Sequence, residues 1–196
     1  SAAPQWPAPY LRRVVLQVAG QEPEEAILTL EDGLQQLPDE VRFLELLAYI
    51  HVGRQDYPGA LDAFARAEQA MKKTKKTPVS ASFNLSYAFA QQVSGNYDEA
   101  ARRLNQSLEK NPALLDAYIQ YVFRSDDTNH LAGCIRVLDQ MGQTTNASPT
   151  VFTYQGLLHN AQEDYPAAIA SFEKAEARAR AMENEDELLG PTFLFW

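Results

Sequence analysis

One segment of this chain occurs twice, and that repetition limits the folds the chain can adopt more than any other feature does. Residues 55–70 read QDYPGALDAFARAEQA and residues 163–178 read EDYPAAIASFEKAEAR, so that Ala60 and Ala168 are 108 residues apart. Both copies carry Asp-Tyr-Pro, followed by Ala, Phe, Ala and Glu at the same offsets. Such a repetition indicates either a duplicated catalytic site or a structural repeat.

Weaker copies of the same pattern fill the rest of the chain. A small residue recurs in steps of 34, 40, 34 and 34 residues, at Ala26, Ala60, Ala100, Cys134 and Ala168. A large apolar residue follows each one four positions later, at Leu30, Phe64, Leu104, Leu138 and Phe172. Three positions further on stand Gly33, Ala67, Ser107, Met141 and Ala175. Small and large residues at this spacing are what closely packed helices require.

A second amphipathic stretch precedes each of these helices. The stretches cover residues 9–19, 40–53, 80–95, 113–125 and 148–161, each with apolar residues at helical spacing. Short polar turns such as GRQD and QED join the two helices of a unit, and Pro38 and Pro112 block further helix between units. Each unit is therefore predicted to be helix, turn, helix, turn in 34 residues.

This pattern resembles the tetratricopeptide repeat (TPR) family from about residue 7 to residue 180. The best matches are GNYDEA…L…SLEKNP (95–112) and the two Asp-Tyr-Pro segments, whereas the fourth repeat departs most, with Cys134 and Met141 in place of small alanines. The resemblance implies an all-α, right-handed superhelical solenoid forming one domain over 1–196. Its expected repeats are 7–40, 41–78, 81–114, 115–148 and 149–188, with a sixth beginning at 190–196. Extended second helices are expected through 71–77 and 181–190.

Composition excludes several classes of function. The formal charge of −9 argues against a nucleic-acid partner, because such partners need clustered Lys and Arg, and the one basic cluster, 72–76, suits a helix end. No apolar run approaches the roughly 18 residues of a membrane span. The single cysteine cannot form an intrachain disulfide, so cysteine usage favours neither an oxidising nor a reducing compartment. The Ala/Pro-rich start without methionine resembles a trimmed chain or a mature exported one, which slightly favours an exported or periplasmic protein.

Candidate catalytic and metal-ligating residues do not converge. His51 and His159 take equivalent places in repeats three apart, and His130 has no ligand-type residue four positions on. A metal site needs convergent ligands, and a hydrolytic carboxylate pair needs a shared pocket. No Gly-rich phosphate loop and no nucleophile-elbow serine occurs. We therefore expect no enzyme activity, no metal, no cofactor and no small-molecule substrate.

What remains is a binding surface. In TPR solenoids the first helices line a concave groove, and the resemblance implies three columns of groove residues here. They are Val15, Tyr49, Phe89, Phe123 and Leu157; Leu11, Glu45, Leu85, Ile119 and Thr153; and Ala8, Arg42, Ser82, Asp116 and Thr150. The candidate partner-binding residues are Tyr49, Phe89, Phe123, Arg42, Glu45, Leu85, Ile119 and Asp116. Two interpretations stay open: the aromatic column is partly buried between helices, or it forms an apolar groove for a peptide.

Some TPR proteins hold chaperone carboxylate tails with a clamp of Lys, Arg and Asn. The matching columns here offer Glu45, Ser86, Asp116 and Gln120, with Arg42 the only cation, so a chaperone-tail receptor is not expected. The leading hypothesis is a scaffold that binds a protein or peptide through the groove. The alternatives are a non-catalytic accessory array of a larger enzyme or a secretion-assembly protein, and self-association through the apolar end at 191–196.

Overall fold

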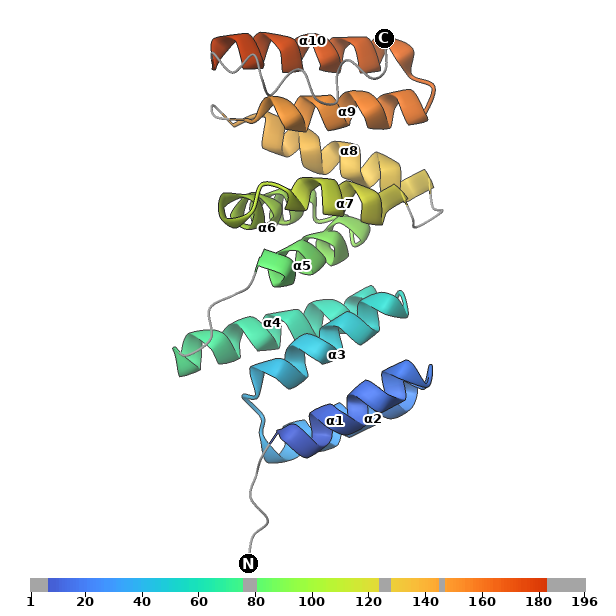
Figure 1. Ribbon diagram of the computed structural model, residues 1–196, viewed down its shortest axis with the longest axis vertical. Coiled ribbons are helices and arrows are strands. Elements are labelled where there is room, and N and C mark those ends of the chain that lie inside the picture. Colours follow the sequence, from blue (N-terminus) through green and yellow to red (C-terminus); the bar gives the residue numbers. More distant parts are fainter. Residues whose placement is uncertain (1–6, 76–80, 124–127, 145–146, 183–196) are drawn as a thin grey trace, which may run out of the picture. The chain divides into compact units, whose positions relative to one another are not determined.

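The two helices expected in each of the five repeats are present in the computed structural model, which describes residues 7–75, 81–123, 128–144 and 147–182 (Figure 1). Within these residues there are ten α-helices and no strand: α1 (Ala8–Ala19), α2 (Pro23–Gln36), α3 (Val41–Gly53), α4 (Tyr57–Thr74), α5 (Ala81–Val93), α6 (Tyr97–Lys110), α7 (Leu114–Phe123), α8 (Thr128–Gly142), α9 (Pro149–Ala161) and α10 (Tyr165–Ala181). They divide between two compact units, Ser1–Ser94 with α1–α5 and Gly95–Trp196 with α6–α10.

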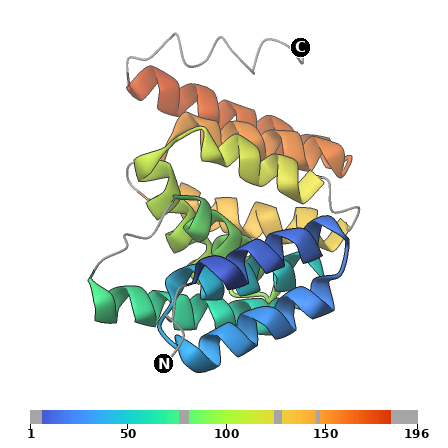
Figure 2. The ribbon, with the colours of Figure 1, turned by 60° about the horizontal axis from the view of Figure 1, so that its bottom comes forward.

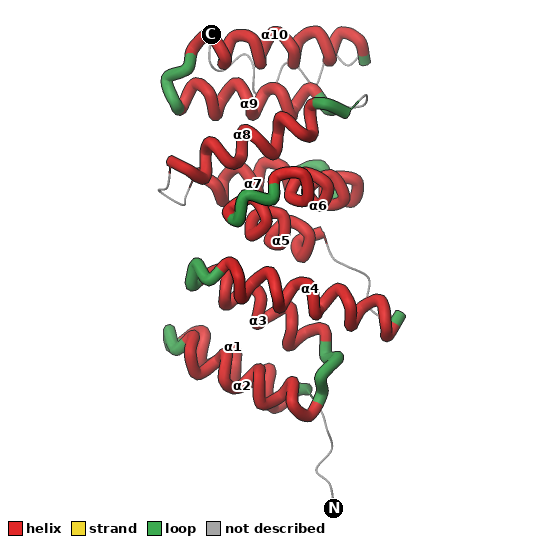
Figure 3. Tube along the Cα trace, turned by 180° about the vertical axis from the view of Figure 1, so that it is seen from behind, coloured by secondary structure: helices red, strands yellow, loops and turns green. Residues whose placement is uncertain are grey.

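The first unit consists of two helical hairpins and one further helix. α1 pairs with α2 and α3 with α4, and each pair is joined by a short loop (Figures 1 and 3). The α1–α2 hairpin is the blue pair in Figure 2. Tyr10 of α1 meets Phe43 of α3 edge to face at a centroid distance of 5.6 Å. α5 covers α4, where Tyr87 stacks on Phe64 at 4.8 Å. The helices are thus held together by aromatic contacts between successive pairs.

The second unit follows the same plan. α6 contacts α7 and α8, α8 contacts α9, and α9 forms a long hairpin with α10 (Figure 1). Its core holds the fully buried Tyr118, Leu138 and Leu158, one each from α7, α8 and α9. The boundary between the two units falls at Gly95, in the turn between the two helices of the predicted third repeat.

The columns of small and large residues form the core of both units. The small residues Ala26, Ala60, Ala100, Cys134 and Ala168 are all buried. Of the large residues that follow them, Leu30, Phe64, Leu104 and Leu138 are buried, and only Phe172 is partly exposed. This agrees with the predicted helix packing, because a small side chain lets the neighbouring helix approach and a large one fills the space beside it.

Four of the described turns between successive helices share one feature of backbone conformation. Gln21, Gln55, Gly95 and Glu163 all have positive φ, between 59° and 81°. In the two Asp-Tyr-Pro copies an aspartate then caps the next helix. Asp56 Oδ1 accepts a hydrogen bond from Gly59 N at 3.1 Å, and Asp164 Oδ1 accepts one from Ala167 N at 3.2 Å. The repeated motif therefore encodes an N-cap followed by a proline in the first helical turn.

The two copies differ around a histidine at the end of the preceding helix. His51 Nδ1 lies 2.7 Å from Asp56 Oδ2, whereas His159 Nδ1 lies 3.9 Å from Asp164 Oδ2. A Cβ atom added at Gly59 would stand 2.7 Å from His51 Nδ1. The second copy has Ala167 at this position, where such a methyl group is present. The close His–Asp contact therefore depends on the glycine.

Most predicted boundaries are confirmed, and one is wrong. α2 ends at Gln36 and α6 at Lys110, before Pro38 and Pro112 as expected. α4 and α10 are the two longest described helices, as their extended tails suggested. However, α4 ends at Thr74 rather than running to Pro78, because Lys75 takes a left-handed conformation with φ 52°. The tail at 183–190 and the start of a sixth repeat at 190–196 lie outside the described residues. The single domain over 1–196 stays a prediction.

Gly95 provides a test of the turn geometry. We expect Gly95→Ala to lower the free energy of unfolding by about 1 kcal/mol, since its φ of 81° strains an L-residue although nothing lies within 4 Å of the added Cβ. The matched control is Gly53→Ala, which also meets no atom within 4 Å but sits in α3 with negative φ, and which should stabilise by about 0.5 kcal/mol. Urea unfolding followed by circular dichroism measures both. Equal effects of the two substitutions would contradict the strain argument.

The cap at Asp56 makes the stability of the first unit depend on pH. The hydrogen bond from the Gly59 amide lowers the pKa of the Asp56 carboxyl below its ordinary 3.8. The folded state thus holds the ionised form, and its stabilising contribution is complete above pH 3.8 and lost as the pH falls further. We expect Asp56→Asn, which keeps the cap acceptor without titrating, to lose less stability than the wild type between about pH 6 and pH 3. Urea midpoints measure this, with Asp62→Asn of the same helix as the control for net charge. An identical loss in Asp56→Asn and wild type would contradict it.

Candidate functional site

The predicted partner-binding residues fall into two sets, one in each unit. Arg42, Glu45 and Tyr49 lie on α3, and Leu85 and Phe89 lie on α5, all in the first unit. Asp116, Ile119 and Phe123 lie on α7 in the second unit. Each unit therefore carries a candidate surface of its own.

The α3 residues form a connected polar group on one helix face. Arg42, Glu45 and Tyr49 are three and four residues apart, which places them one turn above another. Glu45 is half-buried, and its burial raises the pKa of the carboxyl, while the positive charge of Arg42 opposes that rise. The charges of Arg42 and Glu45 therefore interact, and the Arg42 side chain is exposed to solvent.

Tyr49 is held at both ends of its side chain. Its ring meets Phe64 edge to face at 5.9 Å, and its hydroxyl group shares a hydrogen bond with Ser82 of α5. Burial, with a smaller contribution from the charge of Glu45, raises the pKa of Tyr49 to about 12. Tyr49 is therefore a neutral, preorganised hydroxyl group between α3 and α5.

The α5 residues are less exposed than a binding groove would require. Phe89 is only 3% exposed and meets Tyr57 edge to face at 6.1 Å, so it supports the α4–α5 contact from inside. Leu85 is half-buried. Of the aromatic column in this unit, Tyr49 reaches the surface in part and Phe89 does not.

The most exposed large apolar residues described in the first helices of the repeats lie on α1. Val15 is 62% exposed and Val18 is 50% exposed, and Leu11 stands one turn before Val15. Val15 and Leu11 belong to the predicted groove columns, whereas Val18 was not predicted. The periodicity could not separate this stripe from the adjacent buried face, because the buried Val14 and Gln17 have the same three-residue spacing as the exposed Val15 and Val18.

In the second unit the three α7 residues have different roles. Asp116 Oδ1 accepts a hydrogen bond from the Tyr154 hydroxyl of α9 at 2.8 Å. Burial, followed by this contact with Asp116, raises the pKa of Tyr154 to about 12. Ile119 is buried, and Phe123 is exposed at the end of α7. Asp116 thus joins two helices, while Phe123 alone of the three presents an apolar surface.

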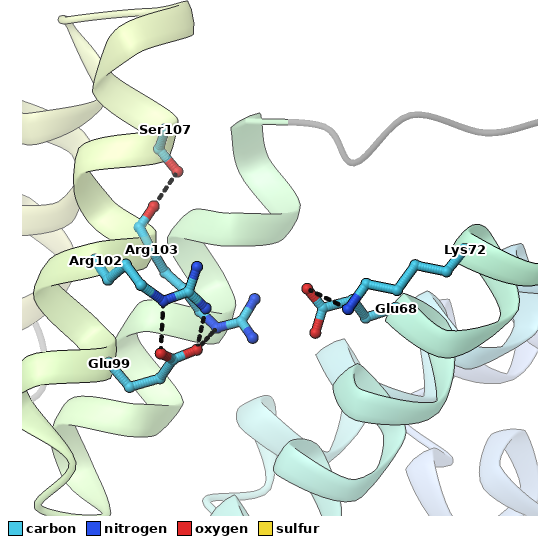
Figure 4. A network of polar contacts seen from close by, with 6 residues as sticks. All are labelled: Glu68, Lys72, Glu99, Arg102, Arg103 and Ser107. Carbon is cyan, nitrogen blue, oxygen red and sulfur yellow. Dashed lines mark hydrogen bonds and ion pairs between the residues drawn. The ribbon is translucent and has the colours of Figure 1, made fainter. Parts of the chain in front are cut away.

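A buried cation on α6 was not predicted. Arg103 is almost fully buried, and its Nε atom lies 2.7 Å from Glu99 Oε1, while Arg102 Nε donates to Glu99 Oε2 at 2.7 Å (Figure 4). These contacts, with Arg102 the largest contributor, lower the pKa of the Glu99 carboxyl. In sequence this group reads as an ordinary amphipathic helix, YDEAARRL, so no signal marked Arg103 as an inward-facing residue.

The described residues contain no set of three or more His, Cys, Asp or Glu side chains placed to hold a metal ion. His51 and His159 face the capping aspartate of their own turn. Cys134 is buried, and burial raises the pKa of its thiol. Over the described ranges, we find no helix with the length and apolar character needed to cross a membrane.

Comparisons with known proteins agree with this architecture. Residues 11–73 match the family model for the tetratricopeptide repeat. The solved structure "Crystal structure of YrrB: a TPR protein with an unusual peptide-binding site" matches with a TM-score of 0.56 and 16% identity, covering 87% of this chain and 85% of that one. A crystal structure of MamA protein matches with a TM-score of 0.55 and 14% identity, covering 91% of this chain and 94% of that one.

A third match is MamA 41-end from Desulfovibrio magneticus RS-1, with a TM-score of 0.54 and 14% identity over 92% of this chain and 98% of that chain. No curated protein matches the sequence. At these identities the structural matches establish the fold, which is the all-α solenoid fold of TPR proteins. Residues 11–73 therefore carry the tetratricopeptide repeat motif, and most of the chain has the fold of TPR proteins.

The contact between Asp116 and Tyr154 allows a test of the predicted partner-binding residues in the second unit. We expect Tyr154→Phe to lower the free energy of unfolding by about 1 kcal/mol, because it removes a hydrogen bond to a carboxylate that joins α7 and α9. In a double-mutant cycle with Asp116→Ala, the two costs should be less than additive. Tyr165→Phe, at an exposed tyrosine of the same unit, is the matched control and should have no effect. Additive costs would show that the contact does not contribute to stability.

Proposed function

We propose that the chain is a scaffold that binds a peptide or protein partner through the face of α1, α3 and α5 in the first unit. This surface, the α1–α3–α5 face, comprises Leu11, Val15, Val18, Arg42, Glu45, Tyr49, Ser82 and Leu85. The observation that carries the proposal is the exposed valine stripe of α1, since Val15 and Val18 are both at least half exposed on the first-helix layer. Exposed apolar stripes on otherwise polar helices are typical of interaction sites.

The chemistry of the face suggests the kind of segment that it binds. The α1 stripe offers apolar contact area without a polar atom, which suits aliphatic or aromatic side chains of a ligand. On α3, the Tyr49 hydroxyl and the Glu45 carboxylate offer hydrogen-bonding groups, and Arg42 adds an exposed cation. The partner is therefore a segment with one or two apolar side chains followed by a polar group.

The rigidity of the face would favour binding. Tyr49 is fixed by Phe64 and Ser82 before a ligand arrives, so little side-chain entropy is lost on association. Phe89, although it was a predicted groove residue, would contribute from beneath by supporting Tyr57. In the second unit, Phe123 and Asp116 offer a smaller candidate surface of the same kind.

The comparisons support this proposal at the level of the fold. TPR proteins are in general non-catalytic scaffolds for protein interaction, and YrrB is described as a TPR protein with an unusual peptide-binding site. The position of that site is not carried over to this chain.

A charge placed in the valine stripe tests the proposal. Peptides selected against the full chain from a random display library would be measured by fluorescence polarisation on the wild type and on Val15→Asp. We expect Val15→Asp to weaken binding at least about ten-fold, which corresponds to about 1.4 kcal/mol, because it puts a carboxylate in an apolar contact. The exposure of Val15 means that the fold should tolerate the change.

The matched control is Leu28→Asp, which introduces the same charge at an exposed apolar residue of α2, outside the face. It should bind the selected peptides like the wild type. Selected peptides that bind Val15→Asp and wild type equally well would contradict the proposed face, as would equal losses in both variants.

A further inference from the structure

One carboxylate of the α1–α3–α5 face is partly withdrawn from water without a donor to replace it. Glu45 of α3 is half-buried, and among the described residues no hydrogen bond or ion pair reaches its carboxylate. Two exposed carboxylates of the same unit do have cationic partners. Glu24 pairs with Arg54 at 3.0 Å. Asp62 pairs with Arg66 at 3.4 Å, so Glu45 is more buried than these two and lacks the partner that each of them has.

This placement costs free energy in the unbound chain. Taking a carboxylate out of water is unfavourable unless hydrogen-bond donors replace the water that it loses. Burial accordingly raises the pKa of the Glu45 carboxyl, and the positive charge of Arg42 opposes that rise without cancelling it. A ligand that brings a charged donor to Glu45 would supply the group that the folded chain lacks.

The neighbours of Glu45 on α3 favour a donor over an acceptor in the ligand. Arg42 stands three residues before Glu45 and Tyr49 four residues after it, so the three share one helix face. The Tyr49 hydroxyl shares a hydrogen bond with Ser82, and a phenol oxygen has two lone pairs, so it can still accept a hydrogen bond from a ligand. Two acceptors, Glu45 and Tyr49, therefore follow each other along the face, with Arg42 at the opposite end of the row.

We propose that Glu45 selects the partner of the α1–α3–α5 face by accepting a basic side chain, that of an arginine or a lysine, from the bound segment. The inference rests on the proposed function, because it assumes that a segment binds to this face. The basic side chain forms a charge-assisted hydrogen bond with the carboxylate, which is stronger than one between neutral groups. The formal charge of −9 on the chain favours the approach of a segment of this kind.

The exposed Arg42 is the weaker determinant of the two. An ion pair that it formed with an acidic ligand residue would lie in water, where such pairs contribute little. The half-buried Glu45 is screened less by solvent and salt, so its charge discriminates more strongly between ligands. The partner segment is therefore apolar and basic rather than apolar and acidic.

A cycle that combines a change in the chain with a change in the peptide tests this inference. Peptides are selected from a random display library against the full chain, and the basic residue of a selected peptide is replaced by glutamine. We expect the selected peptides to contain arginine or lysine, and the glutamine analogue to bind about three- to ten-fold more weakly by fluorescence polarisation. Glu45→Gln should weaken the parent peptide by a similar factor and should bind parent and analogue alike, because the interaction is already lost.

Arg42 should give a change of the opposite sign. Its positive charge repels a cation bound at Glu45, so Arg42→Ala should strengthen the parent peptide about two-fold, and less at high salt. A merely structural role of Glu45 predicts no such gain. The matched control is Glu31→Gln, which makes the same substitution at an exposed carboxylate of α2 outside the face and should bind like the wild type. Circular dichroism checks the fold of every variant.

The outcomes separate this inference from the proposed function. Selected peptides without basic residues, or equal binding by Glu45→Gln and wild type, would overturn the role of Glu45, whereas weakening by Val15→Asp would still support the face. Coupling between Glu45 and the basic residue, together with no effect of Val15→Asp, would support Glu45 and contradict the valine stripe. Failure of the wild type to select any peptide would contradict both.

Discussion

The packing of the helices depends on glycines that face aromatic rings of a neighbouring helix. Because glycine has no side chain, the ring can lie directly against its backbone and the two helices can approach closely. At Gly156 an added Cβ atom would stand 2.5 Å from the Phe172 ring, and at Gly33 it would stand 2.7 Å from the Phe43 ring. Neither ring could stay in place beside an alanine. The buried Ala60 and Ala168 serve the same purpose from the second helix of each hairpin. Gly33 stands in the small-residue column of the second helices, with Ala67 and Ala175, whereas Gly156 lies on a first helix, α9, so both helices of a repeat contribute such sites.

Within this frame the two Asp-Tyr-Pro copies show how little sequence change alters a local interaction. One methyl group, that of Ala167 in place of Gly59, accompanies the increase in the His–Asp distance from 2.7 Å to 3.9 Å. The backbone of the turn hardly changes, with φ values of 60° at Gln55 and 61° at Glu163. The repeat therefore preserves backbone geometry while side-chain contacts diverge, which leaves the exposed positions free to differ in chemistry.

The fold could be read from the sequence because small and large residues at fixed spacing have one favourable arrangement, and the ten helices of the five expected repeats are present. The exposure of the predicted groove residues could be read only in part. The columns include Tyr49 and Val15, which reach the surface, but they could not show that Phe89 is buried against Tyr57, since burial depends on the helix that covers it. α1 has apolar residues on two faces, so the exposure of Val18 needed the structure. Arg103 looks like a surface residue until its neighbours are known.

Cys134 gives the second unit a property that its packing role alone does not suggest. It is the single cysteine of the chain, it lies buried in α8 among core residues, and burial raises the pKa of its thiol. The reactive thiolate is therefore scarce in the native state, and a reagent reaches it only when the helices around α8 separate. Its rate of alkylation reports how often those separations occur. The fourth repeat, with a thiol where the others have a methyl group, thus carries a built-in reporter of local opening that needs no added probe.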